Sequence, residues 1–236
     1  MTPSTPRRSL LPPTLLATAA LLCLAACGGG SSSGLAPSQA LAQAEAHLDA
    51  TSGVHLTLAT TDLPSGVTAP TKAEGVLTRA PAFQGTMTLP VLGASASVGV
   101  ISVGGKVWAK LPFTGSYQAI DPAKFGVPDP ATLLAPKTGV GSLLADSQGA
   151  TKGKSVRGGT DDRSILTEYD ATLSGSDVAR IIPGATGTFQ AAYTIDDAGD
   201  LDQATLTGHF AGDGEPAFTY TVTLSDYGTT QTVTAP

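Results

Sequence analysis

Most of the chain after residue 53 alternates between apolar and polar positions, which is the pattern of strands with one buried face. In the first such segment Val54, Leu56 and Leu58 alternate with polar or small residues. Short breaks rich in Gly, Pro or Asp separate neighbouring segments, so we expect antiparallel pairing. The strands expected from this pattern span residues 54–59, 72–79, 83–91, 94–103, 106–111, 116–120, 151–158, 164–173, 188–196, 201–210 and 217–226.

A helical period appears in only a few places. Leu41, Ala44 and Leu48 fall on one stripe of a helix expected at residues 38–51, with Ser38 as its N-cap. Three shorter helices are expected to begin at Asp129-Pro130, after Gly139, and at Ser174. This order of elements excludes βαβ winding and favours an α+β fold, a large antiparallel sheet with helices on one face.

A sheet of about ten strands has to curl, and helices on its concave face need not fill the enclosed space. Aromatic residues make up only 5% of the chain, Trp108 is its single tryptophan, and the alternating interior positions carry mostly modest aliphatic residues. The same composition also fits a tightly packed core. The residues alone therefore leave an internal cavity and a solid core as alternatives.

The first 26 residues have the order of an export signal, with Arg7 and Arg8 ahead of an apolar run and small residues. The run ends in Leu24-Ala25-Ala26-Cys27, which resembles a bacterial lipobox, the motif in which the cysteine receives a diacylglycerol and the signal is cut before it. An ordinary cleavage site with an incidental cysteine is the alternative, and the export route, Sec or twin-arginine, stays open. We expect a signal peptide at 1–26, a lipidated flexible tether at 27–36 and a folded domain at 37–236.

Loss of this signal makes the chain more acidic. It removes two of 13 basic residues and none of 19 acidic ones, so the formal net charge moves from -6 to -8. Such a surface argues against a nucleic-acid partner. Cys27 is then the single thiol, which excludes an intramolecular disulfide, and we expect a monomer held by its lipid on the extracytoplasmic side of the cell membrane.

Catalytic and metal-binding patterns are not found in the expected domain. It holds no Gly-x-Ser-x-Gly turn between a strand and a helix with Asp and His downstream. His47, His55 and His209 are scattered without zinc-site spacing. Acidic residues gather in one segment that suits a hairpin turn better than a calcium loop: Asp196, Asp197, Asp200 and Asp202. We expect no enzymatic activity, no catalytic residue, no metal and no cofactor.

Several short motifs follow one another in a specific order along residues 37–236. They are Leu77-Thr78-Arg79-Ala80-Pro81, Val103-Gly104-Gly105-Lys106-Val107-Trp108-Ala109, Asp129-Pro130-Ala131, Thr138-Gly139-Val140-Gly141-Ser142-Leu143-Leu144-Ala145, Gly199-Asp200-Leu201-Asp202-Gln203-Ala204 and Thr223-Leu224-Ser225-Asp226-Tyr227-Gly228. With these motifs the chain resembles the LppX/LprG lipoproteins of mycobacteria and related actinobacteria. The resemblance implies a half-barrel with helices on its concave side, enclosing an apolar cavity for lipid acyl chains.

The same resemblance, with strand alternation, implies which residues face this cavity. Met87 is carried over from the family's inward position early in its strand, and the other strand residues follow from alternation or from matching inward aliphatics. The expected lining is Leu77, Met87, Leu89, Val91, Ala96, Val98, Val100, Val107, Ala109, Leu111, Val140, Leu143 and Leu144.

The function implied is that of a carrier or chaperone for the acyl chains of lipids or glycolipids. Its expected partners are a di- or triacylated lipid or glycolipid, the membrane through lipidated Cys27, and a membrane transporter or other acceptor that receives the cargo. The alternative is a surface lipoprotein with a solid core that acts as a scaffold or binding module.

Replacement of Cys27 tests the lipobox. We expect Cys27→Ser to abolish the acyl mass increment of the mature protein, because the thiol is the only acceptor for the diacylglycerol. Intact-protein mass spectrometry measures this increment. Cys23→Ser is the matched control, since Cys23 leaves with the signal. Retention of the same acylated mass in Cys27→Ser would contradict the interpretation.

Overall fold

The computed structural model describes residues 1, 34–91, 94–159 and 163–236, so Cys27 and residues 2–26 of the expected signal peptide lie outside the described residues. Eleven strands form one antiparallel sheet. The strands are β1 Gly53–Ala59, β2 Lys72–Thr78, β3 Ala82–Val91, β4 Ala94–Val103, β5 Lys106–Lys110, β6 Gln118–Ile120, β7 Gln148–Gly158, β8 Ser164–Ser174, β9 Thr186–Ile195, β10 Leu201–His209 and β11 Phe218–Ser225. The sequence-based prediction of antiparallel strands is confirmed, with ends shifted by a few residues.

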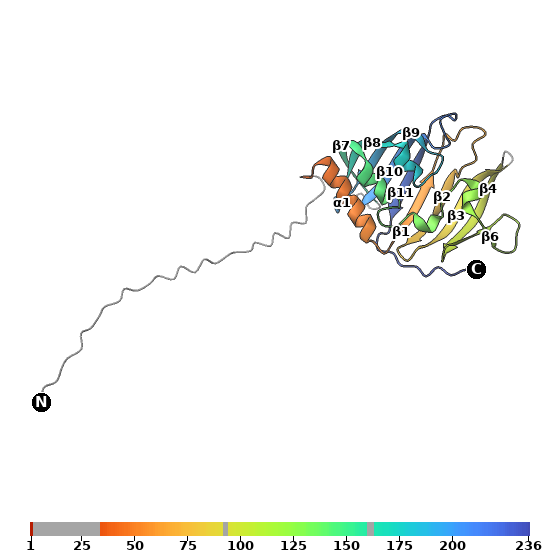
Figure 1. Ribbon diagram of the computed structural model, residues 1–236, viewed down its shortest axis with the longest axis horizontal. Helices are drawn as coiled ribbons and strands as arrows, with labels where there is room; N and C mark the ends of the chain where they lie inside the picture. Colours follow the sequence, from red (N-terminus) through yellow and green to blue (C-terminus); the bar gives the residue numbers. More distant parts are fainter. Residues whose placement is uncertain (2–33, 92–93, 160–162) are drawn as a thin grey trace.

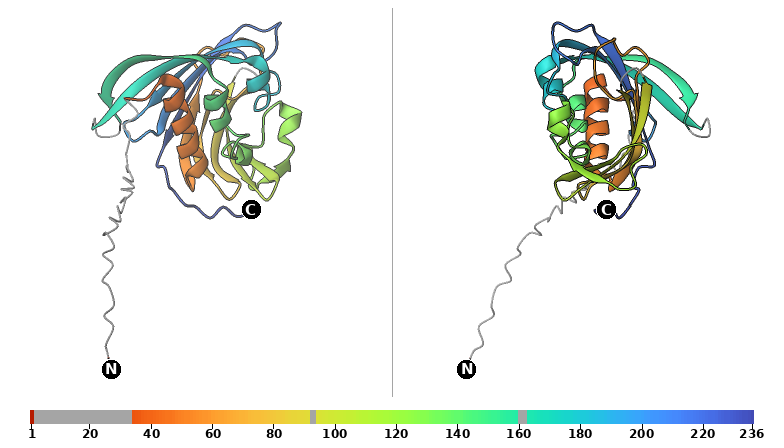
Figure 2. Two further views of the ribbon diagram at one scale, coloured as in Figure 1. Left: turned by 60° about the vertical axis from the view of Figure 1, so that its left-hand side comes forward. Right: turned by 90° about the vertical axis from the view of Figure 1, so that its right-hand side faces the viewer.

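The first and last strands meet in the middle of the sheet. Its order is β6-β5-β4-β3-β2-β1-β11-β10-β9-β8-β7, so β1 pairs with β11 and each half is a meander leading outward to an unpaired edge. The sheet curves and stays open, with helices on its concave face (Figure 2). The α+β half-barrel expected from the sequence is confirmed.

Helix α1, Pro37–Ala50, lies on the concave face and runs into β1 (Figure 1). Its buried stripe includes Ala40, Leu41, Ala44 and Leu48, as the helical period predicts. The expected N-cap is wrong, because Ala36 caps the helix. Pro37 occupies the first helical position, where its fixed φ is favourable and its missing N–H leaves no donor unsatisfied.

The segment between β6 and β7 crosses the concave face, because these two strands are the opposite edges of the sheet (Figure 2). It contains three short helices: η2 Pro122–Phe125, η3 Pro130–Thr132 and α2 Gly141–Asp146. The carboxylates of Asp121 and Asp129 cap η2 and η3 by accepting the N–H groups of Ala123 and Ala131 at 3.1 and 3.0 Å. A further short helix, α3 Gly175–Ala179, follows β8 and is capped by the Ser174 hydroxyl, as expected.

Arg79, just after β2, ties the helical layer to the sheet. Its guanidinium donates to the carbonyl oxygens of Leu48, Thr51 and Leu134 at 2.5, 3.1 and 2.6 Å. Leu48 and Thr51 belong to the C-terminal end of α1, where carbonyls lack helical partners. One side chain thus fixes the end of α1 against both β2 and the crossing segment.

The inward alternation of β3, β4 and β5 follows the sequence pattern. Met87 pairs with Val98, and Val100 pairs with Ala109, so these side chains share the concave face. Alternate residues face the convex side, where Ala82 and Ile101 form a second small cluster with Val233 of the C-terminal tail. Among the described residues, no helix is long and apolar enough to span a membrane.

Removal of the Arg79 side chain tests the tie between helix and sheet. We expect Arg79→Ala to lower the free energy of unfolding by about 2–4 kcal/mol, because three carbonyls lose a charged donor. Arg79→Lys should recover only part of the loss, since an ammonium lacks the planar fork. Chemical denaturation measures both variants, with exposed Lys106→Ala as the control; equal stability of Arg79→Ala and Lys106→Ala would contradict the assignment.

Candidate functional site

An apolar cavity of about 360 Å³ lies between the concave face of the sheet and the helical layer. Six strands contribute to its sheet wall: β1, β2, β3, β9, β10 and β11. The cavity therefore straddles the β1–β11 seam where the two halves of the sheet join.

The sheet wall is built from inward residues of the central strands. Leu56 of β1, Leu206 of β10 and Leu224 of β11 present aliphatic groups, and Ala204 leaves space beside them. These residues follow the period of two, which places alternate side chains on one face. Side chains of modest size on a curved sheet leave the volume that larger residues would occupy.

The helical wall comes from the crossing segment and α3. Leu133 follows η3, Val140 caps α2, and Leu143 and Leu144 lie within α2. Val178, Ile181 and Ile182 of the α3 segment complete this wall. The apolar residues of these short helices thus cover the cavity.

The mouth of the cavity is marked by lining residues that are exposed. They are Thr68, Phe125, Gly126, Gly184 and Ala211. These residues belong to four different connections: the β1–β2 loop, the end of η2, the α3–β9 loop and the β10–β11 loop. Loops of the sheet and of the crossing segment therefore meet at one opening.

The two tyrosines in the wall have hydroxyl groups that are already bonded to protein. The Tyr193 hydroxyl lies 2.9 Å from the Ser147 hydroxyl and donates to the carbonyl of Leu143 at 3.4 Å. The Tyr220 hydroxyl donates to the carbonyl of Pro70 at 2.9 Å. Burial raises the pKa of Tyr193 to about 12 and also raises that of Tyr220. A ligand therefore meets mainly the apolar faces of these rings.

A pair of glycines makes room for an aromatic ring in the wall. Gly75 of β2 and Gly85 of β3 lie opposite each other, and an added Cβ on either would come within 2.8 Å of the Phe83 ring. The ring therefore lies against the backbone of these glycines. This position keeps a large cavity-lining side chain close to the sheet and preserves the volume above it.

Comparison with known proteins connects this architecture to a family. A family model described as LppX_LprAFG lipoprotein matches residues 36–233. The chain belongs to the LppX_LprAFG lipoprotein family. A search among curated proteins gives no significant match.

Two solved structures share the fold of this LppX_LprAFG lipoprotein. LprF from Mycobacterium bovis is 17% identical with a TM-score of 0.67, over 85% of this chain and 96% of that one. The lipoprotein LppX from Mycobacterium tuberculosis is 16% identical with a TM-score of 0.60, over 84% of this chain and 97% of that one. At these identities the two structures establish the shared half-barrel.

The residues expected to line the cavity take several different positions. Met87, Val140, Leu143 and Leu144 line it. A second group is buried in the surrounding core without lining the cavity: Leu77, Val98, Val100, Val107 and Ala109. Their role in lipid binding stays a prediction.

Three further expected residues lie elsewhere, and a fourth is not described. Leu89 packs partly buried against the core, and Ala96 is half-buried. Leu111 is 52% exposed, because β5 ends at Lys110 and the alternation no longer controls the side chain. Val91 is the last residue of β3, and its side chain is not among those that the structure describes.

Sequence reasoning missed much of the actual wall of this LppX_LprAFG lipoprotein. The missed residues come mainly from β1, β10, β11, the α3 segment and the crossing segment, and include Leu56, Leu133, Ile181, Ala204, Leu206 and Tyr220. The alternation in β1, β10 and β11 marks their inward faces. What the sequence did not show was that the first and last strands are neighbours at the centre of the concave face.

The histidines and the acidic segment form no metal site among the described residues, where no three His, Cys, Asp or Glu side chains could hold an ion together. The Asp200 carboxylate lies 2.9 Å from Nδ1 of His47. The Asp196 carboxylate accepts the N–H of Asp200 at 2.8 Å, which closes the β9–β10 turn. Burial raises the pKa of Asp196 and of Asp202.

The buried Tyr193 phenol predicts a loss of stability at high pH. In the unfolded chain this phenol ionises from about pH 10, whereas the folded protein keeps the proton until about 12. Its contribution is therefore complete below pH 10 and decreases between 10 and 12, by about 1.4 kcal/mol per pH unit.

The measurement is the free energy of unfolding by urea between pH 9 and 12 in the parent and in Tyr193→Phe. We expect the free energy of unfolding of Tyr193→Phe to decrease less steeply between pH 10 and 12 than that of the parent, because the contribution of this one phenol is missing. The Ser147 hydroxyl keeps a partner, because it also donates to the carbonyl of Leu143 at 2.8 Å. An identical pH dependence in both proteins would show that Tyr193 is not protected from ionisation.

Proposed function

We propose that this LppX_LprAFG lipoprotein binds an acyl chain of a lipid or glycolipid in the cavity and carries it through the cell envelope. The observation that carries the proposal is an apolar cavity whose tyrosine hydroxyls are bonded to protein groups. Such a wall favours hydrocarbon and offers few hydrogen bonds to a polar ligand.

The energetic need for such a protein follows from the hydrophobic effect. At about 0.8 kcal/mol per methylene, a 16-carbon chain left in water costs about 12 kcal/mol. Spontaneous transfer through water is therefore slow, and each additional chain slows it further. A cavity that accepts hydrocarbon removes most of this barrier, and its sparse polar contacts allow release to an acceptor.

The size of the cavity supports occupation by acyl chains. A methylene takes up about 30 Å³, close to the volume of a water molecule, so 360 Å³ gives room for roughly a dozen methylenes. This is most of one chain. For a di- or triacylated cargo, we propose that one chain enters the described cavity, and that the others need a wider opening at the mouth.

The location proposed for the protein is the extracytoplasmic side of the cell membrane, with residues 27–36 as a tether from lipidated Cys27. A flexible tether of this length averages about 17 Å between its ends. It keeps the domain near lipid cargo and near a membrane transporter or other acceptor. Binding and release of an acyl chain break no covalent bond, so we propose no enzymatic activity and no cofactor. We also propose that the carrier is a monomer.

The alternative function, a scaffold with a solid core, makes a different prediction about lipid content. Organic extraction and mass spectrometry of the purified protein should recover acyl lipid in stoichiometric amount if it is a carrier. Repeated absence of lipid, together with no uptake of a fluorescent fatty acid, would favour the scaffold. The cavity between the sheet and α2 supports the carrier.

Enlargement of one cavity residue tests the site directly. We expect Met87→Trp to abolish uptake of a fluorescent fatty acid while it changes the melting temperature little, because Met87 is half-buried and the indole can occupy cavity volume. Fluorescence titration and thermal denaturation measure the two effects.

Two neighbouring positions on β4 supply controls for Met87→Trp. Ser97→Trp, exposed on the opposite face, should preserve both uptake and stability. Val98→Trp lies in packed core beside Met87 and should destabilise the protein by about 1–3 kcal/mol. Normal uptake in a folded Met87→Trp protein would rule out this part of the cavity as the binding site.

A further inference from the structure

Strongly exposed large apolar side chains are concentrated at one edge of the sheet. Among the described residues other than Met1, the large apolar side chains that are strongly exposed are those of Leu111, Phe113, Phe125 and Val156. Leu111, Phe113 and Phe125, termed the apolar rim, have exposed fractions of 52%, 109% and 60%. All three lie between the end of β5 and the end of η2.

Phe125 of the apolar rim belongs to the mouth of the cavity, and Leu111 and Phe113 lie on the loop between β5 and β6, at the same edge of the sheet. Phe125 itself lines the cavity, together with Gly126 and Val127, which follow it. Gln118 of β6 pairs with Ala109 of β5, so both ends of the loop that carries Leu111 and Phe113 are held by the sheet. The rim therefore belongs to the same edge from which the crossing segment starts over the concave face.

The backbone holds Phe113 outward. Its φ is +66°, a left-handed conformation that is unfavourable for an aromatic residue. The turn is closed by Thr114, whose N–H and hydroxyl both donate to the carbonyl of Leu111, at 3.2 and 2.7 Å. An unfavourable conformation that fully exposes a phenyl ring suggests that the ring is used outside the domain.

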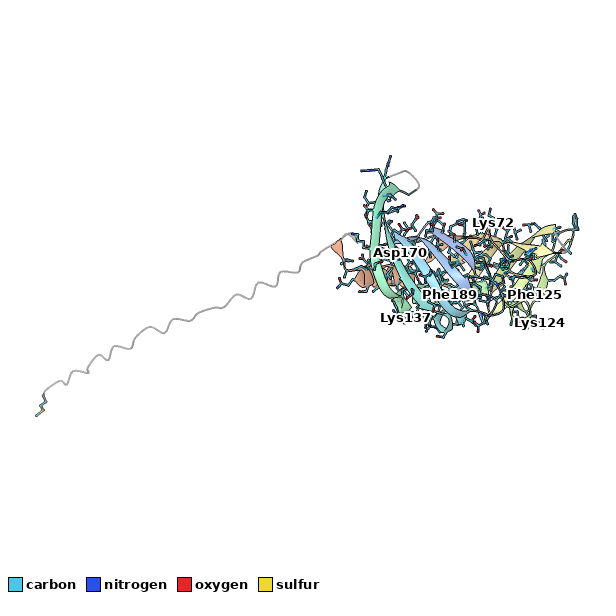
Figure 3. All side chains as sticks on the ribbon, turned by 90° about the horizontal axis from the view of Figure 1, so that it is seen from above. Lys72, Lys124, Phe125, Lys137, Asp170 and Phe189 are labelled. Atoms are coloured by element: carbon cyan, nitrogen blue, oxygen red, sulfur yellow. The ribbon has the colours of Figure 1, made fainter. Side chains whose placement is uncertain are left out.

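Basic side chains accompany the apolar rim in an otherwise acidic protein. Lys110 precedes Leu111, Lys124 precedes Phe125, and both are exposed. Figure 3 shows Lys124 and Phe125 together, towards the opposite end of the sheet from Asp170. Phenyl rings beside lysines match the boundary of a bilayer, where rings enter the acyl region and ammonium groups stay with anionic headgroups.

We propose that the apolar rim docks on the surface of an anionic bilayer and brings the cavity mouth against it. This inference rests on the proposed carrier function and adds how the acyl chain enters: it moves from bilayer to cavity without crossing bulk water. The tether joins the domain at the start of α1, which lies beside β7 at the far edge of the sheet (Figure 1). A second contact at the rim would stop the domain from turning freely about its anchor.

The first test measures insertion of the rim. The lipidated protein is reconstituted in vesicles of three parts phosphatidylcholine to one part phosphatidylglycerol, with or without bromine on the acyl chains. The tryptophan fluorescence of the parent, which comes from Trp108, is subtracted from that of Phe113→Trp. The remaining emission should shift to shorter wavelength on the vesicles and be quenched by brominated acyl chains. Val156→Trp, 47% exposed on β7, is the matched control and should show neither effect. Absence of quenching at Phe113→Trp, or equal quenching at both positions, would overturn the proposal.

The second test separates docking from binding in the cavity. Phe113→Asp should slow uptake of a pyrene-labelled fatty acid from these vesicles by about tenfold or more. Its uptake of the same probe as monomer from water should stay unchanged, because Phe113 does not line the cavity. Val156→Asp should match the parent from both sources.

The outcomes of the second test distinguish the two proposals. Normal uptake from vesicles by Phe113→Asp, or equal slowing from both sources, would overturn docking by the rim. Failure of the parent to take up probe from either source would contradict the carrier function, while quenching of Phe113→Trp would still decide whether the rim enters the bilayer. A rim that served a protein partner would leave the tryptophan unquenched and so would also overturn the proposal.

Discussion

Pairing between the first and last strands is the constraint on which the rest of the structure depends. Because β1 and β11 meet in the middle, the two meanders end at opposite edges, and β6 can reach β7 only across the sheet. The connection runs over the concave face, where its short helices form a second layer. Arg79 fixes that layer by bonding carbonyls of α1 and of the crossing segment. The cavity is the space that remains between a curved sheet and a connection whose helices are short.

The chemistry of the cavity follows from how its polar groups are satisfied. Buried hydroxyl groups need partners, and Tyr193 and Tyr220 find theirs in Ser147 and Pro70 within the surrounding structure. Phe83 lies against Gly75 and Gly85 and so leaves the centre empty. These features favour a hydrocarbon ligand over a polar one. They also make binding dependent on shape and apolar area, which suits a protein that has to release what it carries.

The sequence predicted the fold in detail and the site only in part. Alternation predicted which face of each strand is buried, and Met87 and Val98 do share the concave face. A residue on the concave face does not always line the cavity, however. Val98 is covered by packed side chains, whereas Met87 borders empty space. Leu111 shows the other limit, since a period of two has no meaning beyond the end of β5 at Lys110.

The sequence by itself determined the strand and helix positions, the turns between them and the lipobox-like segment ending at Cys27, because these depend on residues close together in the chain. It also indicated membership of a family of lipoproteins, through the order of short motifs along the chain. The tertiary structure decided that β1 and β11 are neighbours, that the cavity lies at their seam, and that Leu56, Leu206 and Tyr220 share one wall. Empty volume is a property of many distant side chains at once, because it depends on how far the helices stand from the curved sheet, and no local pattern encodes that distance.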